Sequence, residues 1–423
     1  MVTPSLNVCR AALIVFACAY ALLLPTGAFS FWRSLAFAAA ALLTLVVAMT
    51  GRRANEPLPR IGKAIPAAVL TWALWSAASV AWSVDRAFSL QEVKADVVWG
   101  LVTMAVFYVA ASMRGGFRLL SAALLAGLAF WTALALGLAM SSNGWDLRPF
   151  HRGEGAFATY LVTVSPFLAL LLWQSPLGFA TGRRSLAVLA LLAALVVLAA
   201  RWSENRILWV AFAVSLLIVA LAARPKSGSL VGPVVVATLI AAFAWLFVDA
   251  SRQRDEQFAV PERSVTATIA ADPRLAIWKH AKERISARPW QGYGYGLHIL
   301  GREIGADTGD AKVRHPHNVF VSQWLQTGAI GAALFVVMLG CVAWRFVRFL
   351  RSGNDDVARL GAVGLAVLAA FAIRNLTDDF FIRANGKILF AACAILLAAG
   401  IVRLRDDARL ITPAASGRGL APA

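Results

Sequence analysis

The sequence predicts an all-α polytopic membrane protein, with about twelve transmembrane helices and one large loop outside the membrane. Of its 423 residues, 60% are hydrophobic and only 15% are charged. Soluble domains are closer to half apolar and about a quarter charged. Apolar runs recur along the whole chain, and many of them approach the roughly 20 residues that a helix needs to cross a bilayer. One connection between these runs is much longer than the others.

The apolar runs divide the chain into four parts. Residues 1–250 hold transmembrane helices one to nine, and residues 251–320 form the large outer loop with an amphipathic helix. Residues 321–405 hold helices ten to twelve, and residues 406–423 form a cytoplasmic tail. We interpret the first run as a membrane helix and not as a signal peptide, because further spans follow at once. The predicted spans lie near residues 11–27, 30–50, 64–82, 97–113, 119–140, 156–175, 185–200, 207–223, 229–249, 325–347, 358–374 and 387–403.

The basic residues follow the loops that are predicted to lie inside the cell. The formal net charge is +18. Inside loops of membrane proteins are enriched in Lys and Arg. If the N-terminus of this chain is placed inside, every loop that then lies inside is basic. Both termini are therefore predicted to be cytoplasmic. No nucleic-acid partner is expected, because no basic and aromatic module lies outside these loops. The basic residues are Arg52, Arg53, Arg60, Lys63, Arg114, Arg118, Arg183, Arg184, Arg224, Lys226, Arg345, Arg348, Arg351, Arg403, Arg405 and Arg409.

The outer loop, from Ser251 to about Phe320, is long enough to indicate a function. It contains ADPRLAIWKHAKERISARPWQGYGYG. Asp272 and Pro273 suit the N-cap and the first position of a helix, and apolar residues follow at helical spacing. RPWQGYGYG ends that helix with a proline and a run of glycines. An alternative is a helix on the membrane surface with interfacial aromatic anchors. Those aromatic residues are Trp278, Trp290, Tyr293 and Tyr295.

Arginines gather in the outer loops, although outer loops are generally poor in positive charge. A guanidinium stays charged and binds phosphate oxygens in pairs, so this pattern indicates an anionic ligand. Arg206 lies in RWSENRILWVAF, a short turn between two spans that also contains Arg201 and Glu204. A charge at the mouth of a membrane helix either extends to the lipid headgroups or marks a site. We favour a site at Arg206.

Three more arginines lie on the predicted amphipathic helix of the outer loop. Arg274 precedes Trp278 at the start of this helix, and Arg284 and Arg288 follow near its end. Residues four apart on a helix share a face, so Arg284 and Arg288 can act together. For Arg288 the alternative is a basic side chain that pairs with the last carbonyls of the helix.

No metal site is predicted from the sequence. The outer acidic pairs contain no D-x-D motif, and the four cysteines show no CxxC spacing and lie outside the predicted outer loops. No disulfide is therefore expected. Arginine side chains can neutralise a phosphate leaving group in place of an ion, so we expect metal-independent chemistry. The acidic pairs are Asp255 with Glu256, Asp307 with Asp310, and Asp378 with Asp379.

Two of the five histidines flank Pro316, where the outer loop meets the next span. Pro316 moves His315 out of helical geometry, and His317 and Asn318 then stand at the N-terminal end of the following helix. A polar residue there is ordinarily a helix cap, and this alternative stays open for Asn318. A neutral imidazole also suits a general base, and nearby arginines and a helix N-terminus keep it neutral. We expect His317 to be that base, and His315 stays undecided.

Three blocks occur in a fixed order: SENRILWVAF, then RLAIWKHAKERISARPWQGYGYG, then HPHNVFVSQWLQTGAIGAALFVV. Together they resemble the O-antigen ligase and polymerase superfamily, with its early arginine, its Arg…Trp helix and its His-Asn block. Gly328 and Gly331 match a Gly-x-x-Gly-like start of the membrane segment. The resemblance covers about Ser203 to Gly340 and departs at Gln326, where many relatives carry Glu.

The resemblance implies a C-type glycosyltransferase-like fold in the bacterial inner membrane, with the outer loop and the active site facing the periplasm. It implies transfer of an O-antigen glycan from undecaprenyl diphosphate to the lipid A-core oligosaccharide, with membrane lipids as further partners. The essential histidine of the family falls on His317. Its arginines fall on Arg206 and Arg274, and we add Arg288 as a ligand of the diphosphate. Further candidates are Arg201, Arg284, Asn318, His315, Tyr293 and Asp379.

Two rival enzymes share the donor: an O-antigen polymerase and a ligase that moves O-glycans onto protein. The modest outer loop and the single Arg…Trp–His module favour the lipopolysaccharide ligase. The rival of another class is a transporter, such as a flippase for the lipid carrier. A transporter shows broken helices and charges at the midplane in both halves, whereas the strongest charges here lie at one face.

Overall fold

The structure is a computed structural model of the chain. It describes residues 4–53, 58–141, 153–173, 183–203, 205–222, 231–257, 274–308 and 314–411. Every regular element within these ranges is helical, which confirms the predicted all-α class. Eleven of the described helical stretches are long and apolar enough to cross a membrane, and α11 is a shorter apolar helix. The chain is therefore a multi-pass membrane protein.

The helices form two groups along the chain. One group precedes and the other follows the segment between α12 and α16 (residues 258–318), which we call the loop segment. The first group comprises α1 (Pro4–Leu23), α2 (Ser30–Arg53), α3 (Ala64–Ala78), α4 (Arg86–Glu92), α5 (Trp99–Ala111), α6 (Gly116–Ser141), α8 (Glu154–Val164), α9 (Leu170–Trp173), α10 (Arg183–Trp202), α11 (Ile207–Ala222) and α12 (Val231–Gln257). Short helical turns η1 (Ser79–Trp82), η2 (Val93–Val98) and η3 (Ser165–Ala169) continue three of them. The loop segment carries α14 (Arg274–Ala287) and α15 (Gly301–Thr308). The second group comprises α16 (Val319–Leu350), α17 (Asp355–Asn375) and α18 (Arg383–Ile411).

One span is longer than the sequence predicts. Helical structure is continuous from Arg86 to Ala111 through α4, η2 and α5, whereas the predicted span begins near residue 97. Glu92, Lys94 and Asp96 interrupt the apolar run here, yet Glu92 and Asp96 are buried. Ionisable side chains inside a membrane protein are costly, and they usually have a functional reason to be there.

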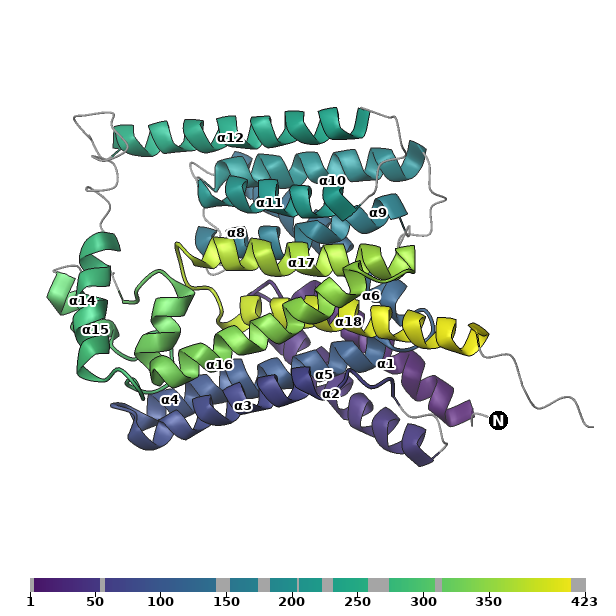
Figure 1. Cartoon of the computed structure of the whole chain (residues 1–423), viewed down its shortest axis with the longest axis horizontal. Helices are drawn as coiled ribbons and strands as arrows, with labels where there is room; N and C mark the ends of the chain where they lie inside the picture. Colours follow the sequence, from purple (N-terminus) through teal and green to yellow (C-terminus); the bar gives the residue numbers. More distant parts are fainter. Residues whose placement is uncertain are drawn as a thin grey trace, which may run out of the picture.

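The long helices lie side by side with their axes roughly aligned, and α14 and α15 stand beyond one end of the bundle (Figure 1). We call this the α14 end. Helix α16 begins and α17 ends here, and the two are joined where the Asn318 side chain donates to the carbonyl of Leu376. The N-terminal end of α1 and the C-terminal end of α18 lie at the opposite end (Figure 1).

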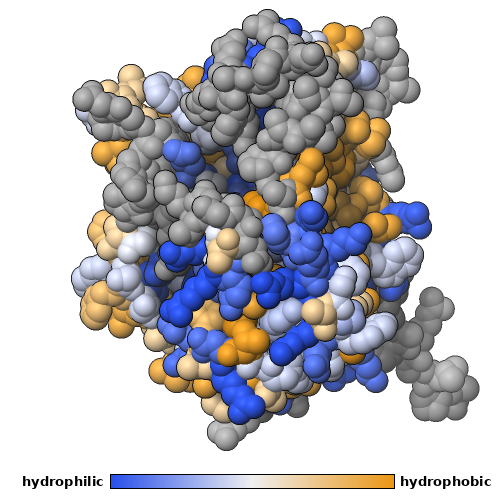
Figure 2. Space-filling view, turned by 90° about the vertical axis from the view of Figure 1, so that its left-hand side faces the viewer, coloured by the Kyte–Doolittle hydropathy of each residue, from blue (hydrophilic) through white to orange (hydrophobic). Residues whose placement is uncertain are grey.

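The surface of the α14 end is mixed in character. Figure 2 shows hydrophilic residues gathered on this face, with hydrophobic residues along its sides. The hydrophobic sides continue onto the outward faces of the long helices, where large apolar residues such as Leu74 and Trp344 are exposed. A polar end on an apolar body is the pattern of a bundle that stands in a bilayer with its end at the water interface.

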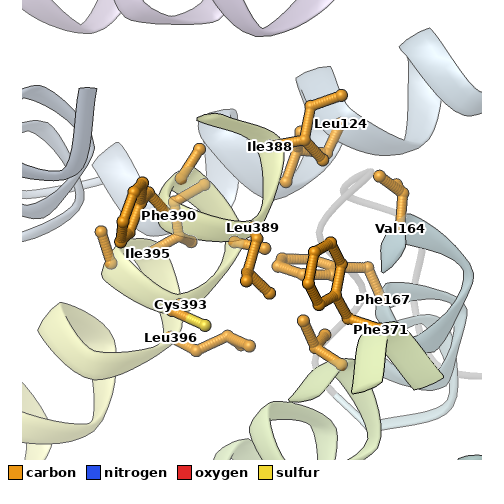
Figure 3. Packing of buried hydrophobic residues seen from close by; sticks show 14 of the residues in the cluster. Leu124, Val164, Phe167, Phe371, Ile388, Leu389, Phe390, Cys393, Ile395 and Leu396 are labelled. Atoms are coloured by element: carbon orange, nitrogen blue, oxygen red, sulfur yellow. The ribbon is translucent and has the colours of Figure 1, made fainter. Parts of the chain in front are cut away.

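The most deeply packed part of the bundle surrounds α18. Leu389, Cys393 and Leu396 of this helix are buried, and Leu389 points toward Phe371 of α17 and Phe167 of η3 (Figure 3). Lipid chains are as apolar as these residues, so close van der Waals packing, and not only exclusion from water, stabilises the contacts.

Small residues let α16 and α17 approach closely. A Cβ atom added to Gly364 of α17 would collide with the ring of Phe346 of α16. A Cβ atom on Gly400 of α18 would likewise collide with the ring of Phe349. Glycines at helix contacts are typical of membrane bundles, because they bring backbones within van der Waals reach.

Helix α16 is interrupted at Gly328, and the segment that follows α14 crosses this interruption. The backbone at Gly328 has φ 70 and ψ −178. The N–H of Ala329 donates to the carbonyl of Pro289 at 2.8 Å, and the N–H of Tyr293 donates to the carbonyl of Gln326 at 3.1 Å. The loop segment thus pairs backbone groups of α16 that the break releases.

Glycine is required on both sides of this contact. Gly292 (φ 66) and Gly328 both lie in the left-handed region, which glycine adopts at little cost. A Cβ atom on Gly292 would also lie 2.6 Å from the carbonyl oxygen of Gln326. The glycine run after α14 therefore serves close backbone packing, in addition to ending the helix as the sequence predicts.

We expect Gly364→Ala to destabilise the protein by about 1–3 kcal/mol, because the added methyl group overpacks the contact with Phe346. Gly340→Ala is the matched control, since a Cβ atom there meets nothing within 4 Å. Melting temperatures of the two purified variants in the same detergent measure the difference. Equal melting temperatures would contradict the importance of this contact.

Candidate active site

The HPHN segment lies at the α14 end, immediately before α16. Asn318 caps this helix, because its Oδ1 accepts hydrogen bonds from the backbone N–H groups of Phe320 (3.0 Å) and Val321 (3.2 Å). Its Nδ2 donates to the carbonyl of Leu376 at 2.9 Å. Asn318 therefore fixes the start of α16 and joins it to the end of α17.

Two imidazoles share one carboxylate oxygen. Nδ1 of His317 lies 3.0 Å from Oδ1 of Asp378, and Nε2 of His315 lies 3.4 Å from the same atom. The centroids of the two rings are 4.0 Å apart. His317 has φ 52, in the left-handed region that is strained for a residue with a Cβ atom. When Nδ1 of His317 donates its proton to Asp378, Nε2 holds a lone pair.

A buried arginine fixes Asp378 from the other side. Arg374 is 1% exposed, and its guanidinium donates to Oδ2 of Asp378 (3.2 Å) and to the carbonyl of Gly155 (3.3 Å). Only a glycine fits at Gly155, because a Cβ atom there would collide with the ring of Phe380. The end of α17 is thus anchored to the start of α8.

These contacts decide the charge of Asp378. Burial alone would raise the pKa of its carboxyl, but hydrogen bonds from His315 and His317 and the Arg374 charge hold this pKa well below its usual range. Asp378 is therefore ionised at neutral pH. An ionised carboxylate on Nδ1 orients an imidazole and stabilises the imidazolium that forms when Nε2 accepts a proton. This arrangement suits a general base.

A cavity of about 280 Å³ lies beside His315. The ring centroid of His298 is 5.4 Å from that of His315, and both rings line the cavity. Burial and the neighbouring His315 lower the pKa of His298, so His298 is neutral at pH 7. The polar lining comes from distant parts of the chain: Arg33 of α2, His298, His315, Asp379, and Arg383 and Asn385 of α18.

Arg383 connects this cavity to two buried acids of the first helix group. Its backbone N–H donates to Oδ1 of Asp96 at 2.8 Å. Its guanidinium pairs with Glu92 and, at 3.6 Å, with Asp96. No role was predicted for these three residues from the sequence. The signal that could have found the two acids is the cluster of charges within an apolar run, which is rare in membrane spans.

Asp379 occupies a different position from Asp378. Its Oδ1 accepts a hydrogen bond from the N–H of Phe381 at 3.3 Å, and it lines the cavity. Burial raises the pKa of Asp379 to about 6. The carboxylate that contacts the histidines is therefore Asp378, which the sequence identified only as a member of an acidic pair.

The arginines that were predicted as diphosphate ligands or as further candidates lie on α10 and α14, or directly beside α11 and α14. Arg201, in the last turn of α10, forms an ion pair with Asp249 of α12 at 3.2 Å. Arg206 is half-buried and directly precedes α11, which packs against α17. Arg274 is the first residue of α14, and its side chain lies outside the described residues, as does Glu204.

Arg284, Arg288 and Tyr293 meet where α14 ends. The Tyr293 hydroxyl donates to the backbone carbonyl of Arg284 at 2.9 Å, and the Arg288 guanidinium lies 5.0 Å from the centroid of the Tyr293 ring. Tyr293 is buried, which favours a packing role. Nε1 of Trp278 donates to the carbonyl of Pro316 at 2.7 Å. This bond attaches α14 directly to the HPHN segment.

Three side chains around the HPHN segment could hold a metal ion. Donor atoms of His315, His317 and Asp378 lie within 4.8 Å of one another, and two imidazoles with a carboxylate suit Zn²⁺. The Arg374 guanidinium on the same carboxylate opposes a second positive charge there. Metal-independent chemistry stays a prediction.

These features define a class of protein: a multi-pass all-α membrane protein with a histidine–carboxylate pair where its helices meet an extramembrane segment. Residues 167–336 match the family model described as O-antigen ligase. The match confirms the resemblance found in the sequence blocks. Members are ligases and polymerases of glycosyltransferase type, which supports an enzyme role. No curated protein matches the chain.

The range matched by the family model covers only part of the site. It contains Arg206, His315 and His317, and it ends before Arg374 and Asp378. The partners that fix the histidines therefore come from the chain beyond the matched range. Only the folded structure brings these partners next to the histidines.

Asp379→Asn should stabilise the protein at neutral pH. The folded-state pKa of about 6 lies above the ordinary value of 3.8, so wild-type stability falls as pH rises between these values and stays lower above them. The variant should melt at a higher temperature than wild type at about pH 7.5, and the difference should shrink by about pH 4.5. Asp406→Asn, at an exposed position of α18, is the control. A difference that does not change with pH would contradict the argument.

Proposed function

We propose that this protein is a lipopolysaccharide O-antigen ligase of the bacterial inner membrane. It transfers an O-antigen glycan from undecaprenyl diphosphate to the lipid A-core oligosaccharide. The α14 end faces the periplasm, and both termini are cytoplasmic. The observation that carries this proposal is the His317–Asp378 pair, with 3.0 Å between Nδ1 and Oδ1, at the start of α16 and beside the loop segment. The family match over residues 167–336 supports it.

In the proposed reaction, Nε2 of His317 accepts the proton of an acceptor hydroxyl while Asp378 holds the ring through Nδ1. The hydroxyl oxygen forms a bond to the anomeric carbon of the O-antigen, and the bond from that carbon to the diphosphate oxygen breaks. Undecaprenyl diphosphate leaves with the electron pair of the broken bond. A single displacement of this kind inverts the anomeric centre. The glycosyl–diphosphate bond supplies the driving force, so the reaction consumes no nucleotide.

Arginines bind the donor diphosphate in this mechanism. Arg206, Arg274 and Arg288 stabilise the negative charge that develops on the leaving group. Two features support their assignment: Arg206 opens a helix that packs against α17, and α14 is attached to the HPHN segment through Trp278. Arg201 is assigned to structure, because it pairs with Asp249.

Other functions share parts of this site. An O-antigen polymerase and a protein O-glycan ligase use the same donor and base and differ in the acceptor. A lipid-carrier flippase belongs to another class, and it is disfavoured because the Arg374–Asp378–His317 chain presents a base at one end of the bundle and not a charge at mid-membrane.

The acceptor is tested in a strain that lacks its own ligase. We expect the gene to restore long-chain lipopolysaccharide, seen on a gel. Longer lipid-linked polymer without transfer would favour the polymerase, and glycosylated protein would favour the protein ligase. Donor that crosses the membrane without any transfer would favour the flippase.

In the same strain, we expect His317→Ala to abolish visible ligation, because general-base catalysis contributes about a hundredfold to ten-thousandfold to the rate. His280→Ala is the matched control, since His280 lies on α14 and is near only Glu283 among the ion pairs described. Membrane levels of both variants are compared on blots. Full ligation by a normally expressed His317→Ala protein would overturn the assignment.

Asp378→Asn tests the positioning of His317. An amide keeps the shape but favours the wrong imidazole tautomer, so we expect kcat to fall by about a hundredfold or more while KM for donor and acceptor stays close to wild type. Asp356→Asn, at the far end of α17, is the control. The melting temperature should also fall, because the buried Arg374 charge loses its carboxylate. The deciding result is therefore the split between kcat and KM, and a purely structural role would change both together.

A further inference from the structure

The cavity beside His315 has an arginine pair of its own. Arg33 and Arg383, from α2 and α18, both line it. Among the described residues that line it, none is Arg206, Arg274 or Arg288, the proposed ligands of the donor diphosphate. The cavity therefore holds a second pair of guanidinium groups at the α14 end.

Both guanidinium groups of the cavity are held in place. Arg33 donates to the carbonyl of Thr26, and Thr26 itself lines the cavity. Arg383 pairs with Glu92 and Asp96, and neither acid is among the described lining residues. Guanidinium groups that are already ordered bind oxyanions with little further loss of side-chain freedom.

Two polar side chains, Asp379 and His315, form part of the cavity wall. Asp379 is 2% exposed. A carboxyl and an imidazole that line a cavity can pair with hydroxyl groups of a ligand.

The position of the cavity indicates which substrate enters it. His315 lines the cavity, and its ring centroid lies 4.0 Å from that of His317. In a displacement that inverts the anomeric centre, the attacking hydroxyl and the leaving group lie on opposite sides of the anomeric carbon. The base must contact the hydroxyl. A cavity next to the base therefore belongs to the side of the acceptor, and the diphosphate lies on the other side.

We propose that this cavity binds an acidic sugar of the acceptor glycan, one that carries a phosphate or a carboxylate group. Arg33 and Arg383 bind the acidic group, and hydroxyl groups pair with His315, Asp379 and Asn385. A volume of about 280 Å³ is at the small end of ligand pockets and suits one monosaccharide unit. The inference rests on the proposed function only in assigning this sugar to the acceptor.

Direct binding to the purified full-length protein in detergent tests the inference. The probes are glucose 6-phosphate, glucuronate, glucose and farnesyl diphosphate, and calorimetry gives each Kd. We expect wild type to prefer the phosphate or the carboxylate sugar over glucose, and Arg33→Gln to weaken that sugar about tenfold or more. Farnesyl diphosphate, which stands for the donor headgroup, should bind Arg33→Gln as it binds wild type.

Control variants keep this test specific. Arg302→Gln removes an exposed arginine of α15, and it should bind every probe as wild type does. Arg33→Lys keeps the charge but loses the planar fork, so it should recover only part of the affinity. Melting temperatures show whether Arg33→Gln is folded. If it is not folded, the affinity of Arg33→Lys for the acidic sugar, compared with wild type, tests the inference instead. The inference is overturned if wild type binds acidic sugars no better than glucose. It is also overturned if Arg33→Gln weakens binding of farnesyl diphosphate as much as binding of the acidic sugar.

Transfer assays separate this inference from the proposed function. With lipid A-core acceptor, Arg33→Gln should raise KM for the native acceptor about tenfold and leave KM for a dephosphorylated and carboxyl-reduced acceptor unchanged. Equal effects on both acceptors overturn the acidic-sugar subsite. A wild-type protein that binds acidic sugars but transfers no glycan supports the subsite and contradicts the ligase function.

Discussion

The carboxylate of Asp378 is the contact on which the α14 end depends. It accepts a hydrogen bond from Arg374 on one oxygen and lies against two imidazoles on the other. Arg374 is buried, so its charge needs a partner, and Asp378 is partly buried, so its charge needs donors. Each charge lowers the cost of burying the other. The result is a rigid polar centre where an apolar helix bundle ends.

The rest of the α14 end is organised to keep this centre in place. Indole N–H groups bind carbonyls of the loop segment: Trp82 to Gln291 at 2.8 Å and Trp324 to Pro289 at 2.9 Å. Backbone bonds across the break in α16 add to these. The loop segment is therefore attached to both helix groups, and the histidines cannot move independently of the membrane helices that support them.

The sequence predicted the fold because hydropathy and charge are local properties that recur with the length of a bilayer span. It also predicted that His317 and Asn318 stand at a helix start, since Pro316 precedes them. The partner of His317 was beyond local reasoning. Asp378 and Asp379 are adjacent in the sequence, and only tertiary packing turns one toward the histidines and the other toward the cavity. The pairing of Arg383 with Glu92 spans 291 positions, which no short pattern encodes.

The contact between Asp378 and the HPHN segment also constrains how the protein is made. A ribosome that has synthesised the chain through α16 has produced both histidines but neither Arg374 nor Asp378. The hairpin of α17 and α18 has to insert and dock before the polar centre is complete. Because Arg383 at the start of α18 also pairs with Glu92 of α4, this last insertion step joins α18 to a helix made much earlier in synthesis. A chain cut short before Asp378 would leave the histidines without their carboxylate, so the completed site requires that synthesis has passed α17.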